Sequence, residues 1–86
     1  MKLSSKTRYG LKACHILGKS YPDKSVSAST LESYISVSGK YLEKIMRTLA
    51  GRNVVSATRG ASGGYSLSRP PEEITIGEIV RALEDD

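Results

Sequence analysis

Three cations, Lys40, Lys44 and Arg47, follow one another at intervals of four and three residues within residues 38–50. At about 100° per residue, this spacing places all three on one side of a helix. Lysine and arginine side chains pair with phosphate oxygens, and they also reach the acceptor atoms on guanine edges. The pattern therefore favours recognition of a polyanion such as nucleic acid.

Glu43 lies among these cations, and two interpretations of it stay open. A carboxylate that faces DNA is repelled by phosphate, so its benefit must come from accepting a hydrogen bond from a cytosine amino group. Alternatively, Glu43 forms an ordinary ion pair with Arg47, one helical turn further along.

A further cation, Arg59, opens a glycine-rich segment over residues 59–64. Glycine allows positive φ angles and a close approach of the backbone to a bulky partner. At the end of a strand, Arg59 can reach a phosphate or the edge of a narrow minor groove; the alternative is an ordinary hairpin loop with an exposed arginine. Glycine-rich loops also bind nucleotide phosphates, but here no Lys-Ser/Thr pair follows and the loop leads into a strand.

Residue types that perform catalysis are scarce. The chain has one cysteine, Cys14, and one histidine, His15. A lone cysteine excludes an intrachain disulfide and a site built from several thiolates, and it suits a reducing cytoplasm. We expect Cys14 to be a small, partly buried apolar residue off the main stripe of its helix, and His15 to lie at the surface. Because no set of histidine, carboxylate and nucleophile is visible, we expect no enzyme.

The charges are unevenly distributed along the 86 residues. Residues 1–69 contain 12 of the 13 lysines and arginines but only three of the nine acidic residues. A basic body followed by an acidic segment is typical of a protein that binds a polyanion. No apolar run is long enough to span a membrane, and no apolar block follows the basic N-terminus, so we expect neither a membrane span nor a signal peptide.

A helix over residues 38–50 must position the three cations. Its apolar residues recur at the spacing of one buried face: Leu42, Ile45, Met46 and Leu49. Ser38 can cap this helix, and Gly51 can end it in a left-handed conformation.

A shorter helix near residues 28–35 precedes it, and two starts compete. Either Ser27 caps the helix directly, or Ser29 and Glu32 form a capping box. Leu31, Tyr34 and Ile35 supply its apolar side. Residues 36–38 form the turn, with Val37 as a buried plug. Together, residues from about 27 to 50 predict a helix-turn-helix, whose second helix enters the major groove.

The flanking segments complete a small domain over residues 1–86. A first helix over residues 4–19, capped by Ser4 or Ser5, has an apolar face of Tyr9, Ala13, Ile16 and Leu17, and Val26 forms a short strand. Strands over residues 54–58 and 65–68 make a hairpin, or wing, at about 54–68, which ends at the prolines 70 and 71. A capping box of Thr75 and Glu78 starts a last helix at about 75–84, with a stripe of Ile76, Ile79, Val80 and Leu83. The predicted fold is mainly α with a small β-hairpin (α+β), a winged helix-turn-helix.

Taken in order, these residues resemble the bacterial winged-helix regulators typified by IscR, NsrR and CymR, which control iron–sulfur, nitric oxide and cysteine-metabolism genes. The resemblance covers nearly the whole chain, and its most specific part is RGASGGYSL at residues 59–67. The other matching stretches are MKLSSKTRYG at residues 1–10, SGKYLE at 38–43 and PEEITIGEIVRALE at 71–84.

The resemblance implies the sequence-specific DNA-binding domain of a transcription regulator. Residues 38–50 would lie in the major groove, and residues 59–64 on the backbone or in the minor groove. It implies that Ser38, Lys40, Tyr41, Glu43 and Lys44 face DNA and that Arg59 acts from the wing. With Arg8, Gly39, Arg47 and Gly60, these residues form the predicted DNA-binding set.

The chain also departs from the family pattern in its helix pair. Relatives usually have a small alanine in place of Glu32 and a glycine in place of Ser36, so we expect a second helix that is shorter or rotated. Gly39 and Lys40 replace the usual leucine and serine or asparagine, which predicts a DNA site different from those of relatives.

Most relatives continue past the position of Asp86 with a long dimerisation helix and, often, three cysteines. In nitric-oxide-sensing relatives a carboxylate near the position of Arg8 helps to hold an iron–sulfur cluster, and arginine cannot do so. We therefore expect no cofactor in this chain, since a cluster would need cysteines beyond Asp86. Like charges at residues 84–86 meet the negative end of a helix, which leaves open whether the chain is part of a longer parent.

The expected partner is double-stranded DNA in the cytoplasm, bound by a homodimer of the full-length parent, with this chain a monomer or weak dimer. The alternative function is a winged-helix protein-interaction module that binds an acidic protein through the same basic face. A binding assay with random duplex at low salt distinguishes the two.

Overall fold

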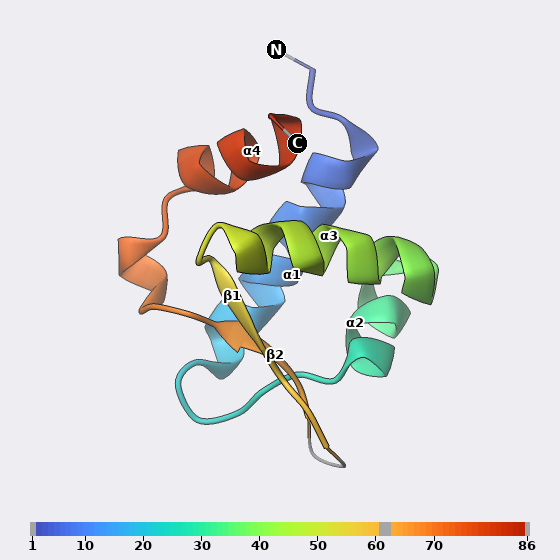
Figure 1. Ribbon diagram of the computed structural model, residues 1–86, viewed down its shortest axis with the longest axis vertical. Helices are drawn as coiled ribbons and strands as arrows, with labels where there is room; N and C mark the ends of the chain where they lie inside the picture. Colours follow the sequence, from blue (N-terminus) through green and yellow to red (C-terminus); the bar gives the residue numbers. More distant parts are fainter. Residues whose placement is uncertain (1, 61–62, 86) are drawn as a thin grey trace.

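The computed structural model describes residues 2–60 and 63–85, which form four helices and one two-stranded antiparallel sheet. The elements are α1 (Ser5–Ser20), α2 (Ala28–Ile35), α3 (Gly39–Gly51), β1 (Val55–Thr58), β2 (Gly64–Leu67), a short 3-10 helix η1 (Pro71–Glu73) and α4 (Ile76–Glu84). In Figure 1, α3 crosses in front of α1, α4 lies above, α2 lies at one end of α3, and the hairpin extends below the helices. The predicted order of elements is confirmed. None of the helices within the described ranges has the length and apolar character needed to cross a membrane.

Each α-helix begins at a hydroxyl side chain that accepts a hydrogen bond from a backbone N–H three residues later. The four caps are Ser4, Ser27, Ser38 and Thr75. α2 therefore starts after Ser27, and the alternative start at Ser29 is wrong. The capping box of Thr75 and Glu78 is only half formed, because the Glu78 carboxylate pairs with Arg69 instead.

The buried face of α3 is the predicted one, and its four side chains are fully buried: Leu42, Ile45, Met46 and Leu49. In α1, Ala13 and Leu17 are buried, but Tyr9 and Ile16 are only partly so. The face is instead completed by Thr7, Gly10 and Cys14. A Cβ on Gly10 would lie 2.2 Å from the Cδ1 atom of Leu83, so the missing side chain lets α4 pack close to α1. Cys14, 7% exposed, thus belongs to the core rather than lying off the main stripe.

Two apolar residues predicted for the core lie at the surface. Tyr34 is 74% exposed and Ile76 is 70% exposed. In α2, Leu31 and Ile35 stack one turn apart and define the buried direction, and Tyr34 lies about 80° away from it. In α4, Ala82 shares the buried face with Ile79 and Leu83, which turns that face away from Ile76.

The left-handed residue that ends α3 is also not the predicted one. Gly51 remains helical, and Asn53, with φ of 61°, makes the reversal into β1. Asparagine tolerates this conformation because its short polar side chain can bond locally. The turn between α2 and α3 uses Ser36 in the same way, also at φ of 61°.

The hairpin is attached to the segment before α2 midway along its strands. β1 and β2 pair antiparallel, from Val55 opposite Leu67 to Thr58 opposite Gly64. On its other edge, Tyr65 exchanges two backbone hydrogen bonds of 2.8 Å with Val26, the residue before the cap of α2. The short strand predicted at Val26 is therefore a single bridge that adds a third chain segment to the sheet.

Arg69 ties three segments together where the hairpin ends. Its guanidinium donates to the carbonyl oxygens of Asn53 and Glu73, each at 3.2 Å, and to the carboxylate of Glu78. The pair with Glu78 is partly buried. The end of α3, the root of the hairpin and the start of α4 are thereby fixed to one another.

A second polar cluster joins the first turn of α1 to the last turn of α4. The carboxylate of Glu84 accepts hydrogen bonds from the Thr7 hydroxyl, from the Ser4 hydroxyl at 2.8 Å and from the Ser4 backbone N–H at 3.1 Å. These bonds, that from Thr7 foremost, lower the pKa of Glu84 from its ordinary value.

Gly64→Ala should destabilise the domain, whereas Gly51→Ala should not. A Cβ on Gly64 would lie 2.3 Å from the Val26 carbonyl oxygen and break the bridge, at a cost of about 1–3 kcal/mol. Nothing lies within 4 Å of a Cβ on Gly51, so alanine there should stabilise by roughly 0.4–1 kcal/mol. Urea unfolding of both variants measures the difference, and equal stabilities would contradict the close approach.

Glu84→Gln should lower the melting temperature at neutral pH, and the loss should shrink on acidification. A depressed folded-state pKa stabilises the fold above the ordinary glutamate pKa, and this contribution disappears as the pH falls through the folded-state value. Thermal unfolding of wild type and variant from pH 7 to pH 3 tests this, with the exposed Glu72→Gln as control. A gap that is independent of pH would refute the role of the Glu84 charge.

Candidate nucleic-acid interface

The exposed side of α3 carries the predicted row of cations. Lys40, Lys44 and Arg47 are all exposed, opposite the buried face that fixes the rotation of the helix. The helix rises by about 1.5 Å per residue, so this row extends along roughly 10 Å, which fits a groove. Ser38 caps the end of α3 beside α2, with its hydroxyl 3.2 Å from the backbone nitrogen of Tyr41.

Tyr41 is half buried rather than free at the surface. Its ring meets that of Tyr9 edge to face, with 5.9 Å between centroids and an angle of 89° between planes. This contact fastens the first turn of α3 to α1. Tyr41 therefore holds the first turn of α3 in place through its ring.

Glu43 and Arg47 form the ion pair that one of the two interpretations predicts. The Glu43 Oε2 atom lies 3.8 Å from an Arg47 guanidinium nitrogen, and both side chains are more than 60% exposed. Exposed pairs contribute about 0–1 kcal/mol, so DNA could reorganise this one at little cost.

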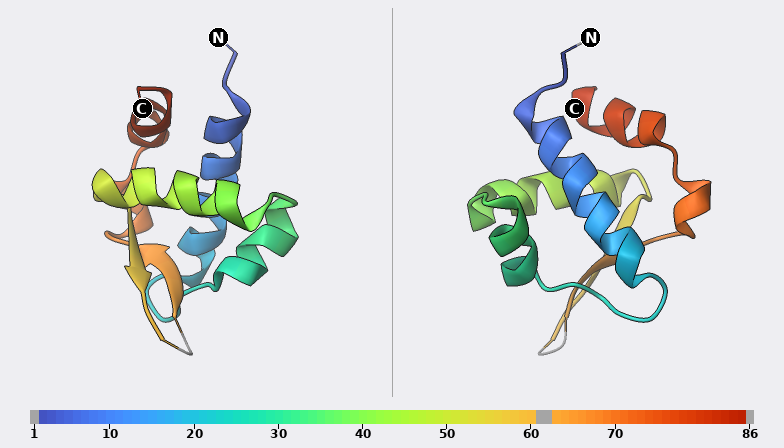
Figure 2. Two further views of the ribbon diagram at one scale, coloured as in Figure 1. Left: turned by 45° about the vertical axis from the view of Figure 1, so that its right-hand side comes forward. Right: turned by 180° about the vertical axis from the view of Figure 1, so that it is seen from behind.

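The hairpin lies next to this side of α3. Burial raises the pKa of Tyr65 in β2, the Glu43 carboxylate raises it further, and the Arg47 guanidinium lowers it. α3 also packs directly against β1, the other strand of the hairpin, so the two elements are neighbours. The views in Figure 2 agree with this arrangement, since the hairpin extends from beneath α3 in both.

The glycine segment makes a tight reversal at the far end of the hairpin. Arg59 and Gly60 are exposed, and Gly60 has φ of 107°, which an L side chain rarely adopts. The Gly63 N–H donates to the Gly60 carbonyl at 3.0 Å. Residues 61 and 62 of the predicted segment lie outside the described residues.

Arg8 is the member of the predicted set that lies apart from the hairpin. It is in the first turns of α1, near α4, at the end of the molecule opposite the hairpin (Figure 1). Its guanidinium donates to the Leu3 carbonyl at 2.8 Å and to the Ser5 hydroxyl at 3.1 Å. The structure thus groups the cations of α3 with the hairpin and leaves Arg8 on a separate element.

Glu32 is a residue that sequence reasoning did not assign to the site. The resemblance implies a second helix that is shorter or rotated relative to those of the similar regulators; α2 spans Ala28–Ile35. The Glu32 carboxylate lies against Gly39, the first residue of α3. The resemblance singled out Glu32 and Gly39 separately, and this was the signal from which their contact could have been found.

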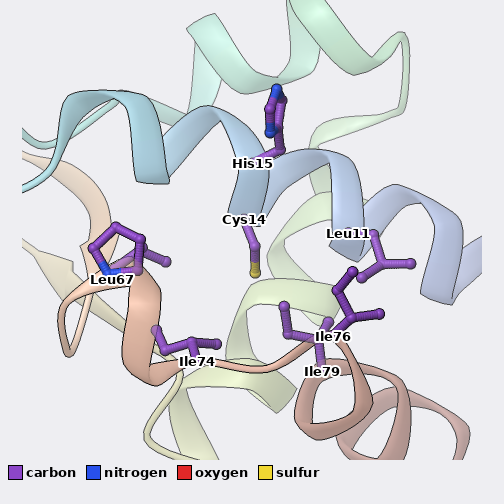
Figure 3. Close-up of a pocket in the computed structure, with 8 residues that line it drawn as sticks. Leu11, Cys14, His15, Leu67, Ile74, Ile76 and Ile79 are labelled. Carbon is purple, nitrogen blue, oxygen red and sulfur yellow. The ribbon is translucent and has the colours of Figure 1, made fainter.

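An apolar pocket lies between α1, β2, η1 and α4. Its lining is Leu11, Cys14, His15, Leu67, Pro71, Ile74, Ile76 and Ile79. Figure 3 shows the Cys14 sulfur pointing toward the isoleucines and the His15 ring pointing away from them. Burial raises the pKa of Cys14 to about 12, so its thiol is protonated at neutral pH and is a poor nucleophile. Within residues 2–60 and 63–85, no three His, Cys, Asp or Glu side chains are grouped to hold a metal ion.

Solved structures of bacterial regulators share this fold. CymR of B. subtilis, described as its global cysteine regulator, superposes with a TM-score of 0.93 and 36% identity, over 100% of this chain and 67% of the other. IscR of T. potens gives a TM-score of 0.87 and 35% identity, over 96% of this chain and 61% of the other. The predicted winged-helix fold is confirmed.

Curated relatives agree in sequence. The transcriptional regulator CymR of Bacillus subtilis is 38% identical over 84 residues, 98% of this chain and 61% of its own length. The regulator NsrR of the same organism is 35% identical over 86 residues, 100% of this chain and 59% of its own length. Protein rrf2 of Nitratidesulfovibrio vulgaris is 35% identical over 85 residues, 99% of this chain and 57% of its own length. The chain thus spans about three fifths of the length of these relatives.

The family model Rrf2, described as iron-dependent transcriptional regulator, matches residues 3–86. Iron needs several donor side chains, and the lone thiol of this chain is buried and protonated, so the residues described here do not fit an iron site. The match nevertheless covers almost every residue, from the start of α1 through α4, and the predicted resemblance to IscR, NsrR and CymR is confirmed. The chain therefore belongs to the Rrf2 family of transcriptional regulators.

Proposed function

We propose that this chain is the sequence-specific DNA-binding domain of a bacterial transcription regulator. In this proposal α3 enters the major groove, and the hairpin lies on the adjoining backbone or in the minor groove. The observation that carries it is the row of Lys40, Lys44 and Arg47 on the exposed side of α3, next to Tyr65 of the hairpin. The regulators that this chain is similar to support it as well.

Each predicted residue has a role in this proposal. Lys40, Lys44 and Arg47 pair with phosphates or reach guanine edges, and the Ser38 and Gly39 backbone approaches the bases at the start of α3. Tyr41 positions this turn through Tyr9, and Glu43 holds the Arg47 guanidinium in an exposed ion pair that DNA must compete with. Arg59 and Gly60 contact the backbone or minor groove from the hairpin, and Arg8 binds a phosphate from α1.

We also propose that the full-length protein binds DNA in the cytoplasm as a homodimer on a near-palindromic site. Two-fold symmetric proteins place their recognition helices one turn of DNA apart, which doubles the contacts of one domain. The 86-residue chain is then expected to bind more weakly than its parent.

Lys44→Ala and Arg59→Ala should each reduce the salt dependence of DNA binding. A side chain that neutralises one phosphate releases about one counterion, so the slope of log K against log[salt] should flatten by about one unit. Fluorescence anisotropy with a labelled random duplex at several salt concentrations measures the slope. Lys12→Ala is the matched control, because it removes the same charge from an exposed position of α1, in a hollow that it shares with Ile16 and Tyr34. An unchanged slope would show that the substituted residue does not contact phosphate. A wild-type chain that binds no duplex at low salt would favour the protein-interaction module.

Glu43→Gln should strengthen binding to random and selected duplexes alike. The substitution removes a negative charge from the interface and frees Arg47 from its pair, while the exposed pair contributes little to folding. Affinities for a panel of duplexes test this. Loss of preference for cytosine at one position, with binding otherwise retained, would instead show that Glu43 reads a base.

A further inference from the structure

The first residue of α3 is in direct contact with a carboxylate from α2. A Cβ on Gly39 would lie 3.0 Å from the Glu32 Oε2 atom and 3.4 Å from both Oε1 and Cδ. Glu32 precedes the left-handed residue Ser36 by one helical turn, and the turn that follows brings α3 back beside it. The carboxylate therefore occupies the space in which a larger side chain at position 39 would lie.

Glu32 keeps its acceptor atoms available. Within the part of the chain that the structure describes, neither a hydrogen-bond donor nor a cation engages its carboxylate. Glu43, the other acidic residue of the helix pair, is paired with Arg47. Of the two carboxylates of the helix pair, only that of Glu32 is thus ready to accept a new hydrogen bond.

An unpaired carboxylate in an interface that binds phosphate has an electrostatic cost. The positive end of the α3 dipole offsets part of it, because the carboxylate lies at the N-terminus of that helix. A direct gain requires an amino group to donate to it, and the cytosine N4 amino group supplies this donor in the major groove. The N-terminal residues of a recognition helix are those that contact base edges, so the carboxylate beside Gly39 lies at the appropriate end of α3.

We propose that Glu32 is a specificity-determining residue that selects a cytosine by accepting a hydrogen bond from its N4 amino group, and that Gly39 leaves the room for this contact. The inference rests on the DNA-binding function proposed above. It adds α2 to the elements that determine which DNA sequence is bound, through the contact between Glu32 and Gly39.

Selection from a library of random duplexes, carried out with the 86-residue chain at low salt, tests the proposal. Wild type should prefer cytosine at one position, and Glu32→Ala should lose that preference by about tenfold. Glu32→Gln should move the preference to adenine, because a carboxamide can both donate to and accept from the adenine edge. A merely structural role for Glu32 would change the melting temperature but not the selected base.

Two further variants separate the contact from its charge. Gly39→Ala should shift the carboxylate by a few tenths of an ångström and weaken the cytosine preference, but it should have no further effect on the preference in a Glu32→Ala background. Glu72→Gln removes an equal charge from the exposed η1, at the end of the molecule opposite α2 (Figure 1), and should leave the selected sequence unchanged.

Failure of this inference is distinguishable from failure of the proposed function. If wild type selects a defined sequence and Glu32→Gln selects the same one at every position, Glu32 does not read a base while the DNA-binding function stands. If wild type binds no duplex at low salt, the proposed function and this inference are both wrong.

Discussion

The orientation of α3 depends on one constraint: the same 13 residues must supply both the centre of the core and the exposed row of cations. Four of its side chains are fully buried, and each contributes about 1.5–3 kcal/mol through burial. Rotation of the helix about its axis would expose some of them and bury Lys44 or Arg47 instead. The packing of the core therefore determines where the charges point, and the tie from Arg69 to Asn53 and Glu78 holds the hairpin in place beside them.

Local pattern was sufficient to predict α3, its cap and its charged side, because strong apolar residues repeat there without interruption. Local pattern was insufficient to predict the parts of the core that are built from small residues. Gly10 and Cys14 carry a weak apolar signal. Gly10 is covered by Leu83 of α4, more than 60 residues away, and Cys14 lies beside Ile74 and Ile79, about as far along the chain. For Tyr34 and Ile76 the prediction was wrong in the opposite direction, since both were expected in the core and lie at the surface. Each is on a short helix whose buried direction is set by smaller neighbours.

Part of the candidate site could likewise be predicted from local pattern, and part could not. The spacing of Lys40, Lys44 and Arg47 within one helix predicted that they share a side. The contact between Glu32 and Gly39 crosses a turn, and no periodicity relates residues on two different helices. Spacing could not decide between a base contact and an ion pair with Arg47 for Glu43, because the same position in the helix allows both. The ion pair is seen only in the positions of the side chains.

The bridge between Val26 and Tyr65 has a mechanical consequence. Because Tyr65, midway along the hairpin, exchanges two backbone hydrogen bonds with Val26, the residue before the cap of α2, the hairpin is tied to the helix pair. In the proposed complex with DNA, this tie sets the separation between α3 in one groove and the hairpin on the next. A duplex with a different groove spacing must bend or twist to engage both, and the energy of that deformation varies with base sequence. Base pairs that no side chain touches would then also affect affinity, through the stiffness of the DNA.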